Sequence, residues 1–366
     1  MIKLWHFPEF NMVRYNDQMV VVGNLQDIIP NDTVPNVMIA TFQGDGDISV
    51  EQIIEYQKIF DRVVLVCWDV PVCVVELIQQ FDHPKIYVVT VGQINCIPKH
   101  LKMVDGLQIS FAEVQRLYRG PTSKILEGLN PMKSKNFYFD GLLGMQGRPH
   151  RQFILQQIES SEFADKFYVR EQIPGQSLED AIATNHWEWP QHAVLIPETN
   201  VNDFGSNRRV RFADTDMNTN ISCIVPVEIY NKTCYSIIAE TYSHSCARTD
   251  NNIAWSNWIL LTEKTAKPII AKRLFIMFGG PGYLTHLHRL GFQTFHSVID
   301  ESYDSIEDNQ QRWSSAFAQV EYLCRQPQEE ILEKIAPILE HNHNLFMSRD
   351  WDNEFYQAIT TAITEF

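Results

Sequence analysis

An acidic residue stands beside a lysine in Thr262-Glu263-Lys264, just before a stretch with helical spacing. The first backbone amides of a helix have no partner within the helix, and Thr262 is suited to cap them. A carboxylate there can accept hydrogen bonds from two ribose hydroxyls, while the ammonium and the helix N-terminus attract phosphate oxygens. The pattern therefore favours a diphosphate site. The alternative is a capping-turn carboxylate beside a solvated lysine.

Two arginines, Arg148 and Arg151, fall at the start of a predicted helix over 148–160, which follows a predicted strand over 136–143. The positive end of a helix dipole disfavours cations. The pair is easier to explain if an anion binds between the guanidinium groups, which suit phosphate oxygens. A solvated helix start is the alternative.

Other patterns are weaker. Asp214 and Asp216 form a DxD pair of the kind that holds Mg²⁺ or Mn²⁺, but such pairs are frequent in a chain with 45 acidic residues. The 12 histidines show no metal-binding spacing, so no essential metal is expected. The turn Gly279-Gly-Pro-Gly282 lacks the GxGxxG spacing and predicts a tight turn.

The composition is that of a globular protein, with 366 residues, 45% of them apolar. The net charge of −15 argues against a protein that coats nucleic acid non-specifically. The seven cysteines are odd in number and form no CxxC pair, so we expect reduced thiols and a cytoplasmic protein. Signal-peptide features and apolar runs of bilayer length are both missing from the sequence, so no membrane partner is expected.

The order of elements predicts an α/β fold. Val- and Ile-rich runs without polar alternation are typical of parallel strands covered on both faces. In the first part we predict strands at 19–22, 37–42, 63–68, 86–91 and 106–110, and helices at 50–60 and 74–81. In the second part we predict strands at 136–143, 166–169, 221–227, 235–240 and 274–278, helices at 148–160, 262–271 and 283–290, and an irregular insertion over 173–220.

These elements predict two Rossmann-like lobes that face a central cleft, 1–132 and 133–325, followed by a helical tail over 326–366. Helices are predicted at 306–323, 329–339 and 352–364, and the tail is long enough to cross back to the first lobe. Ligands bind at the carboxyl ends of the strands in such an architecture.

One segment resembles a known family. The run TEKTAKPIIAKRLFIMFG over 262–279 looks like the donor-binding segment of GT-B glycosyltransferases of the fucosyltransferase and exostosin type. Continued through GFQTF at 291–295 and IDESYD at 299–304, it is similar to glycosyltransferases of T-even-like bacteriophages and cyanophages. The resemblance covers about residues 136–325. The first 130 residues match only in the alternation of predicted strands and helices. It implies a metal-independent glycosyltransferase with a UDP- or GDP-linked sugar donor.

Carried over to this chain, the resemblance implies that Glu263 holds the nucleotide ribose and that Lys264 binds the diphosphate. The segment NFYFDGLLGMQGRPHR at 136–151 is similar to the strand that opens the donor lobe, after which an arginine neutralises the leaving diphosphate. Arg148 or Arg151 would take that role.

Two further donor-lobe residues are candidates. Glu240 matches the acidic residue before the Glu-Lys segment of the phage proteins, and its carboxylate would point into the cleft from a strand end. The alternative is a strand-terminal carboxylate paired with Arg248 or Lys272. Arg248 itself is a further candidate for binding phosphate.

Sugar transfer with inversion needs a group that takes the proton from the acceptor hydroxyl. Asp45 follows the predicted strand at 37–42 and is the first candidate base. Asp69, after the strand at 63–68, is the second. A polar turn or a helix cap is the alternative for both.

The phage resemblance implies that the acceptor is a hydroxymethylated base, such as 5-hydroxymethylcytosine, in double-stranded DNA, modified in the host cytoplasm. Arg208, Arg209 and Arg211, joined in space by Lys133, Lys135 and Arg148, would supply a basic surface for it. Solvated loop cations are the alternative. A glycan or protein acceptor is a second hypothesis, and a non-catalytic nucleotide-binding or virion-associated module is a third.

Overall fold

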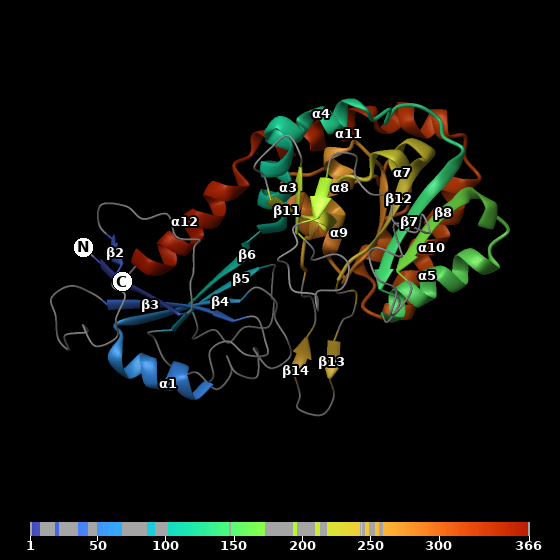
Figure 1. Ribbon diagram of the computed structural model, residues 1–366. Helices are drawn as coiled ribbons and strands as arrows, with labels where there is room; N and C mark the ends of the chain where they lie inside the picture. The colour runs from blue at the N-terminus through green and yellow to red at the C-terminus, as the bar shows by residue number, and fades with distance from the viewer. Residues whose placement is uncertain are drawn as a thin grey trace. The chain divides into compact units, whose positions relative to one another are not determined.

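The computed structural model shows an α/β protein that divides into two compact units (Figure 1). The first unit comprises Met1–Ile109, Arg248–Trp258 and Trp351–Phe366, and the second comprises Ser110–Ala247 and Ile259–Asp350. These boundaries differ from the expected ones, because residues 110–132 join the second unit and the end of the tail joins the first. The described residues are 2–7, 19–21, 36–42, 50–67, 86–91, 102–107, 109–145, 148–172, 193–195, 209–212, 218–241, 243, 246–248, 253–255 and 259–364.

The first unit contains a six-stranded parallel sheet in the order β2-β1-β3-β4-β5-β6. Its strands are β1 (Ile2–Phe7), β2 (Met19–Val21), β3 (Asn36–Phe42), β4 (Arg62–Cys67), β5 (Ile86–Val91) and β6 (Lys102–Leu107). Val63, Val64 and Leu65 are buried, as an apolar strand without polar alternation requires. The sheet confirms the α/β fold with parallel strands that was expected for this part of the chain.

Among the described helices, α1 (Val50–Ile59) and α12 (Trp351–Thr364) pack on this sheet. Helix α1 contacts β4, and the last helix, α12, packs on β4, β5 and β6. Arg62 of β4 donates a hydrogen bond of 2.7 Å to the carbonyl oxygen of Ala362 and lies 4.2 Å above the ring of Tyr87. The end of the chain is therefore part of the first unit.

The second unit is built on a four-stranded parallel sheet in the order β15-β12-β7-β8. Its central strand β12 is buried along its whole length. Helix α5 packs on α10, and α8 packs on α11 and β12. The strands are β7 (Phe137–Met145), β8 (Phe167–Gln172), β12 (Thr233–Ala239) and β15 (Phe275–Phe278). The helices are α3 (Ile109–Arg119), α4 (Lys124–Glu127), α5 (Pro149–Ser160), α7 (Val227–Lys232), α8 (Glu263–Ile270), α9 (Tyr283–Arg289), α10 (Asn309–Cys324) and α11 (Gln328–Ser348).

Three predictions of local structure were wrong. Residues 106–107 end β6 (Lys102–Leu107) and residues 109–110 begin α3, whose buried Phe111, Val114 and Leu117 recur at helical spacing. Residues 221–227 form a short 3₁₀ turn, Ile221–Cys223, followed by Pro226 as the N-cap of α7. The insertion over 173–220 is partly regular, since β9 (Ala193–Leu195), β10 (Arg209–Phe212) and β11 (Asn218–Asn220) form an antiparallel sheet. The predicted helix at 74–81 lies outside the described residues.

A buried ion pair joins the strands of the second sheet. Nη2 of Arg273, just before β15, lies 2.6 Å from Oδ2 of Asp140 on β7, and their side chains are 3% and 2% exposed. The same guanidinium donates to Oγ of Ser236, to Oγ1 of Thr233 and to the carbonyl oxygens of Tyr230, Thr233 and Tyr235. Every donor of this buried cation therefore has an acceptor.

Within the described part of the chain, no helix combines the length and the apolar character that crossing a membrane requires.

Candidate functional site

The four-stranded sheet has a topological switch point between β7 and β12. From β7 the chain continues through α5 to β8 on one side, and from β12 it continues through α8 to β15 on the other side. Open parallel sheets bind ligands outside the carboxyl ends of the strands at such a point. The residues that directly follow β7 and β12, which include Arg148, Arg151, Glu240 and Thr241, are therefore the primary candidates.

Helix α5 brings the two predicted arginines to this edge. Arg148 is its N-cap and is half-buried, and Arg151 lies in its first turn and is buried. Nη2 of Arg151 donates a hydrogen bond of 3.3 Å to the carbonyl oxygen of Ala239, the last residue of β12. Burial lowers the pKa of Arg151 to about 10, and Arg148 acts in the same direction, while Glu240 and Glu263 oppose it. Arg151 is thus still cationic at neutral pH.

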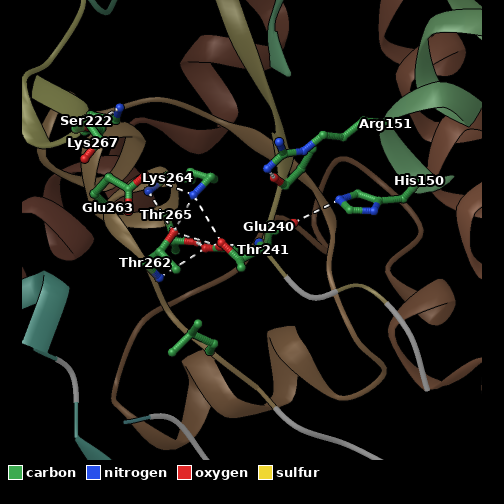
Figure 2. Close-up of polar contacts among 12 residues, drawn as sticks. His150, Arg151, Ser222, Glu240, Thr241, Thr262, Glu263, Lys264, Thr265 and Lys267 are labelled. Atoms are coloured by element: carbon green, nitrogen blue, oxygen red, sulfur yellow. Dashed lines mark hydrogen bonds and ion pairs between the residues drawn. The ribbon is translucent and has the colours of Figure 1, made fainter. Parts of the chain in front are cut away.

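Helix α8 brings the Glu-Lys pair to the same edge (Figure 2). Thr262 is its N-cap, and its Oγ1 accepts a hydrogen bond of 3.2 Å from the backbone N–H of Lys264, which confirms the predicted cap. Nζ of Lys264 lies 3.0 Å from Oε1 of Glu263, and their side chains are 26% and 16% exposed. The same ammonium lies 3.4 Å from the hydroxyl oxygens of Thr241 and Thr262.

The strand end and the two helix starts meet around Glu240. Nε2 of the buried His150, next to Arg151, lies 2.9 Å from the Glu240 carbonyl oxygen. In Figure 2 the side chains of Arg151 and Lys264 both lie near Glu240 and Thr241. Two cations from the first turns of two helices, Arg151 and Lys264, therefore lie at the end of β12 at the switch point, and Glu263 is paired with Lys264.

The Glu240 carboxylate is fully buried and saturated with hydrogen bonds. It accepts from Oγ1 of Thr262 (2.7 Å), Oγ1 of Thr265 (2.8 Å) and the hydroxyl of Tyr283 (2.8 Å), and from the backbone N–H groups of Thr262 and Thr241. Such a carboxylate holds the start of α8 in place from inside the protein. Direct contact between Glu240 and a donor stays a prediction. Lys272, an alternative partner for Glu240, is instead paired with Glu340.

Lys267 was missed by the sequence reasoning. It lies one turn after Glu263, and its Nζ donates a hydrogen bond of 2.6 Å to the carbonyl oxygen of Ser222. Burial raises the pKa of the Glu263 carboxyl, but the charges of Lys264 and Lys267 outweigh burial and hold that pKa below its ordinary value. The four-residue spacing of Glu263 and Lys267 on a helix was the available signal.

Several predicted site residues lie outside the described residues or on sheets other than the four-stranded one. Asp45, Asp69 and Arg208 lie outside the described residues, as does the DxD pair at 214–216. Arg209 and Arg211 are on β10 of the antiparallel sheet, and Arg248 is the last residue of β13 (Cys246–Arg248), which pairs in a two-stranded sheet with β14 (Ile253–Trp255). Their roles stay predictions.

The predicted basic surface needs a correction. Lys133 and Lys135 precede β7, whereas Arg148 follows it. The strand has nine residues, which at about 3.3 Å each separate its two ends by roughly 30 Å. Lys133 and Lys135 therefore lie at the amino end of the sheet and Arg148 lies at the carboxyl end, so the three do not form one patch.

Helix α9, which follows the Gly279–Gly282 turn, contains the buried histidine His286. Burial lowers the pKa of His286 to about 4, and Arg289 acts in the same direction. Protonation therefore favours the unfolded chain, and stability present above pH 6.5 is lost as the pH falls toward 4. We expect this residue to reduce the free energy of unfolding by about 2 kcal/mol between pH 7 and pH 5. Urea denaturation at a series of pH values checks this, because His286→Gln should lose that part of the pH dependence. Identical pH profiles for both proteins would contradict it.

Among the described residues, no group of three or more His, Cys, Asp or Glu side chains is placed to hold a metal ion. The chain matches no protein-family model, and comparisons with curated proteins and with solved structures found no match.

Proposed function

We propose that this protein is a glycosyltransferase that binds a nucleotide-sugar donor at the carboxyl edge of the four-stranded sheet and transfers the sugar to a hydroxyl group. One observation carries the proposal: Arg151 from the start of α5 and Lys264 from the start of α8 both reach the end of β12 at the topological switch point. Arg151 donates to the Ala239 carbonyl oxygen, and Lys264, paired with Glu263, lies near the Thr241 hydroxyl. Cations at two helix N-termini, one of them paired with a carboxylate, suit a ligand that combines phosphates with vicinal hydroxyls.

The contacts of Lys264 support a role in binding phosphate. An ammonium group has three donors, and Lys264 already lies near acceptors on Glu263, Thr241 and Thr262. A phosphate oxygen can replace these partly exposed contacts, since a charged acceptor makes the stronger hydrogen bond. Glu263 would then keep Lys267 as its counter-charge and could accept hydrogen bonds from two ribose hydroxyls.

Arg148 and Arg151 suit the leaving group. When the bond between the sugar and the diphosphate breaks, negative charge develops on the nucleoside diphosphate, and fixed cations stabilise it. Arg151 is held for this by its hydrogen bond to the end of β12, while Arg148 is more exposed. The like charges of these two arginines become favourable when an anion binds between them.

The path of the chain supports a GT-B arrangement with the acceptor on the first unit. Each unit is built on a parallel sheet, and the last helix, α12, returns to pack on the sheet of the first unit. The new bond would form between the acceptor oxygen and the sugar, with the hydroxyl proton passing to a base, for which Asp45 and Asp69 remain the candidates. A hydroxymethylated base in DNA remains our proposed acceptor, and a glycan or protein hydroxyl remains the alternative.

A donor panel with an intact-mass readout tests the activity. The protein is incubated with UDP- and GDP-linked sugars and with hydroxymethylated duplex DNA, glycans or proteins. A mass increase of one sugar on DNA supports the proposed acceptor, and an increase on another acceptor supports the alternative. Tight nucleotide binding without any transfer would favour a non-catalytic nucleotide-binding module, and no nucleotide binding at all would refute the donor site.

Glu263→Gln is expected to remove most of the thermal stabilisation that UDP or GDP gives the wild type. The carboxylate accepts hydrogen bonds from two ribose hydroxyls in this proposal. The wild type should therefore prefer UDP over 2′-deoxy-UDP by about tenfold or more in affinity, and the variant should lose this preference. Thermal shift and calorimetry measure both effects. Glu340→Gln, a carboxylate of the same unit that pairs with Lys272, is the matched control. Unchanged ribose preference in Glu263→Gln would contradict the role of Glu263.

A further inference from the structure

The Gly279–Gly282 turn between β15 and α9 forms a seat for the ring of Tyr283. A Cβ atom at Gly279 would lie 2.7 Å from Cδ2 of that ring, which is too close for two carbon atoms. Gly282 has a φ of +79°, a left-handed conformation that glycine adopts without strain. The two glycines thus allow the chain to turn sharply and the ring to pack against the turn, where it is buried.

Three backbone amides of this turn and of the start of α9 already have acceptors within the protein. The side chain of Asp304 accepts hydrogen bonds from the backbone N–H groups of Leu284 (2.8 Å) and Thr285 (3.0 Å) at the start of α9. The carbonyl oxygen of Asp304 also accepts from the N–H of Gly282, at 2.7 Å. Asp304 therefore fixes the position of α9 and, with it, the position of Tyr283.

The Tyr283 hydroxyl reaches from this seat to the start of α8. It donates to Oε1 of Glu240 at 2.8 Å and lies 2.9 Å from Oγ1 of Thr265, which also donates to Oε1 of Glu240. Burial, together with the nearby Glu240, raises the pKa of Tyr283 well above its ordinary value, so the hydroxyl stays protonated at every pH where the protein would work. Glu240 thus receives hydrogen bonds from the end of β12, from the first residues of α8 and from α9.

We propose that Tyr283, seated in the Gly279–Gly282 turn, is a positioning residue for the end of α8 that carries Glu263 and Lys264, and that it acts through Glu240 and Thr265. This inference rests on the proposed function, because it concerns the same phosphate-binding residues. The hydroxyl of Tyr283 and the hydroxyls of Thr262 and Thr265 converge on one buried carboxylate. Loss of one donor leaves that carboxylate under-satisfied and loosens the first turn of α8.

Tyr283→Phe removes the hydroxyl and keeps the ring. Gly279→Ala keeps the hydroxyl but displaces the ring from its seat. The matched control is Tyr235→Phe, because the Tyr235 hydroxyl is also buried in this unit but is not among the donors to Glu240. The measurements are hydrogen–deuterium exchange of the segment 259–270 without ligand, and calorimetric affinities for UDP, GDP and inorganic pyrophosphate.

We expect Tyr283→Phe and Gly279→Ala to speed amide exchange in the first turn of α8 and to weaken binding of all three probes by about tenfold, as loss of an outer supporting hydrogen bond does at other sites. Tyr235→Phe should change neither quantity. Wild-type exchange rates in both Tyr283→Phe and Gly279→Ala would overturn the positioning role, whether or not the probes bind. If the wild type binds none of the probes, the proposed function fails, and the exchange data still decide the role of Tyr283.

Discussion

Asp140→Ala is expected to lower the free energy of unfolding by about 3–5 kcal/mol, because it leaves the charge of Arg273 buried without its partner. The other acceptors of the Arg273 guanidinium are neutral oxygens of Tyr230, Thr233, Tyr235 and Ser236. They satisfy its hydrogen bonds but do not neutralise its charge. The loss should appear as a fall of about 10 °C in melting temperature for a unit of this size. Thermal and urea denaturation followed by circular dichroism measure it.

The matched control is Glu162→Ala. Glu162 pairs with Arg325 in the same unit at 2.9 Å, but the two side chains are 68% and 49% exposed. Water screens such a pair, so the variant should lower the free energy of unfolding by less than about 1 kcal/mol. A double variant, Asp140→Leu with Arg273→Met, should be more stable than Asp140→Ala, because it removes both charges. If Asp140→Ala were as mild as Glu162→Ala, the ion pair would not hold the sheet together.

Lys264→Ala is expected to weaken the binding of UDP and GDP by about tenfold to a hundredfold, the range for losing hydrogen bonds from a charged donor. The free energy of unfolding should change little, because the contacts of Lys264 are partly exposed. The variant should also flatten the dependence of UDP affinity on salt concentration, since it removes a cation that faces the phosphates. Calorimetry at several salt concentrations measures both effects.

Lys272→Ala provides the control for this substitution. Lys272 lies just beyond the other end of α8 and pairs with Glu340, so Lys272→Ala removes the same charge near the same helix without touching the proposed site. Its affinity for UDP should match that of the wild type. Equal weakening by Lys264→Ala and Lys272→Ala would indicate a general effect of net charge and would contradict a phosphate contact by Lys264.

The sequence by itself determined the local pieces of this site. Thr262 caps a helix that begins at Glu263, and Arg148 and Arg151 start another, because caps, turn residues and helical spacing act within a few residues of each other. The same local signals failed at 106–110 and 221–227, where short apolar runs suit a strand and a buried helix equally well. Nearness in sequence also led to a wrong prediction of one basic surface, since Lys135 and Arg148 lie at opposite ends of β7.

Only the tertiary structure decided which of these pieces meet. The switch point exists because β12 pairs with β7, and this pairing brings Arg151 to the end of β12, 88 residues away. Glu240 and Tyr283 are 43 residues apart, and Asp140 and Arg273 are 133 apart. Such partners are chosen by the strand order and by the free energy of burying charged and polar groups together, and neither leaves a periodic trace in the sequence. For that reason the sequence placed Glu240 at a strand end but did not reveal that its carboxylate is fully buried and accepts hydrogen bonds from Thr262 and Tyr283.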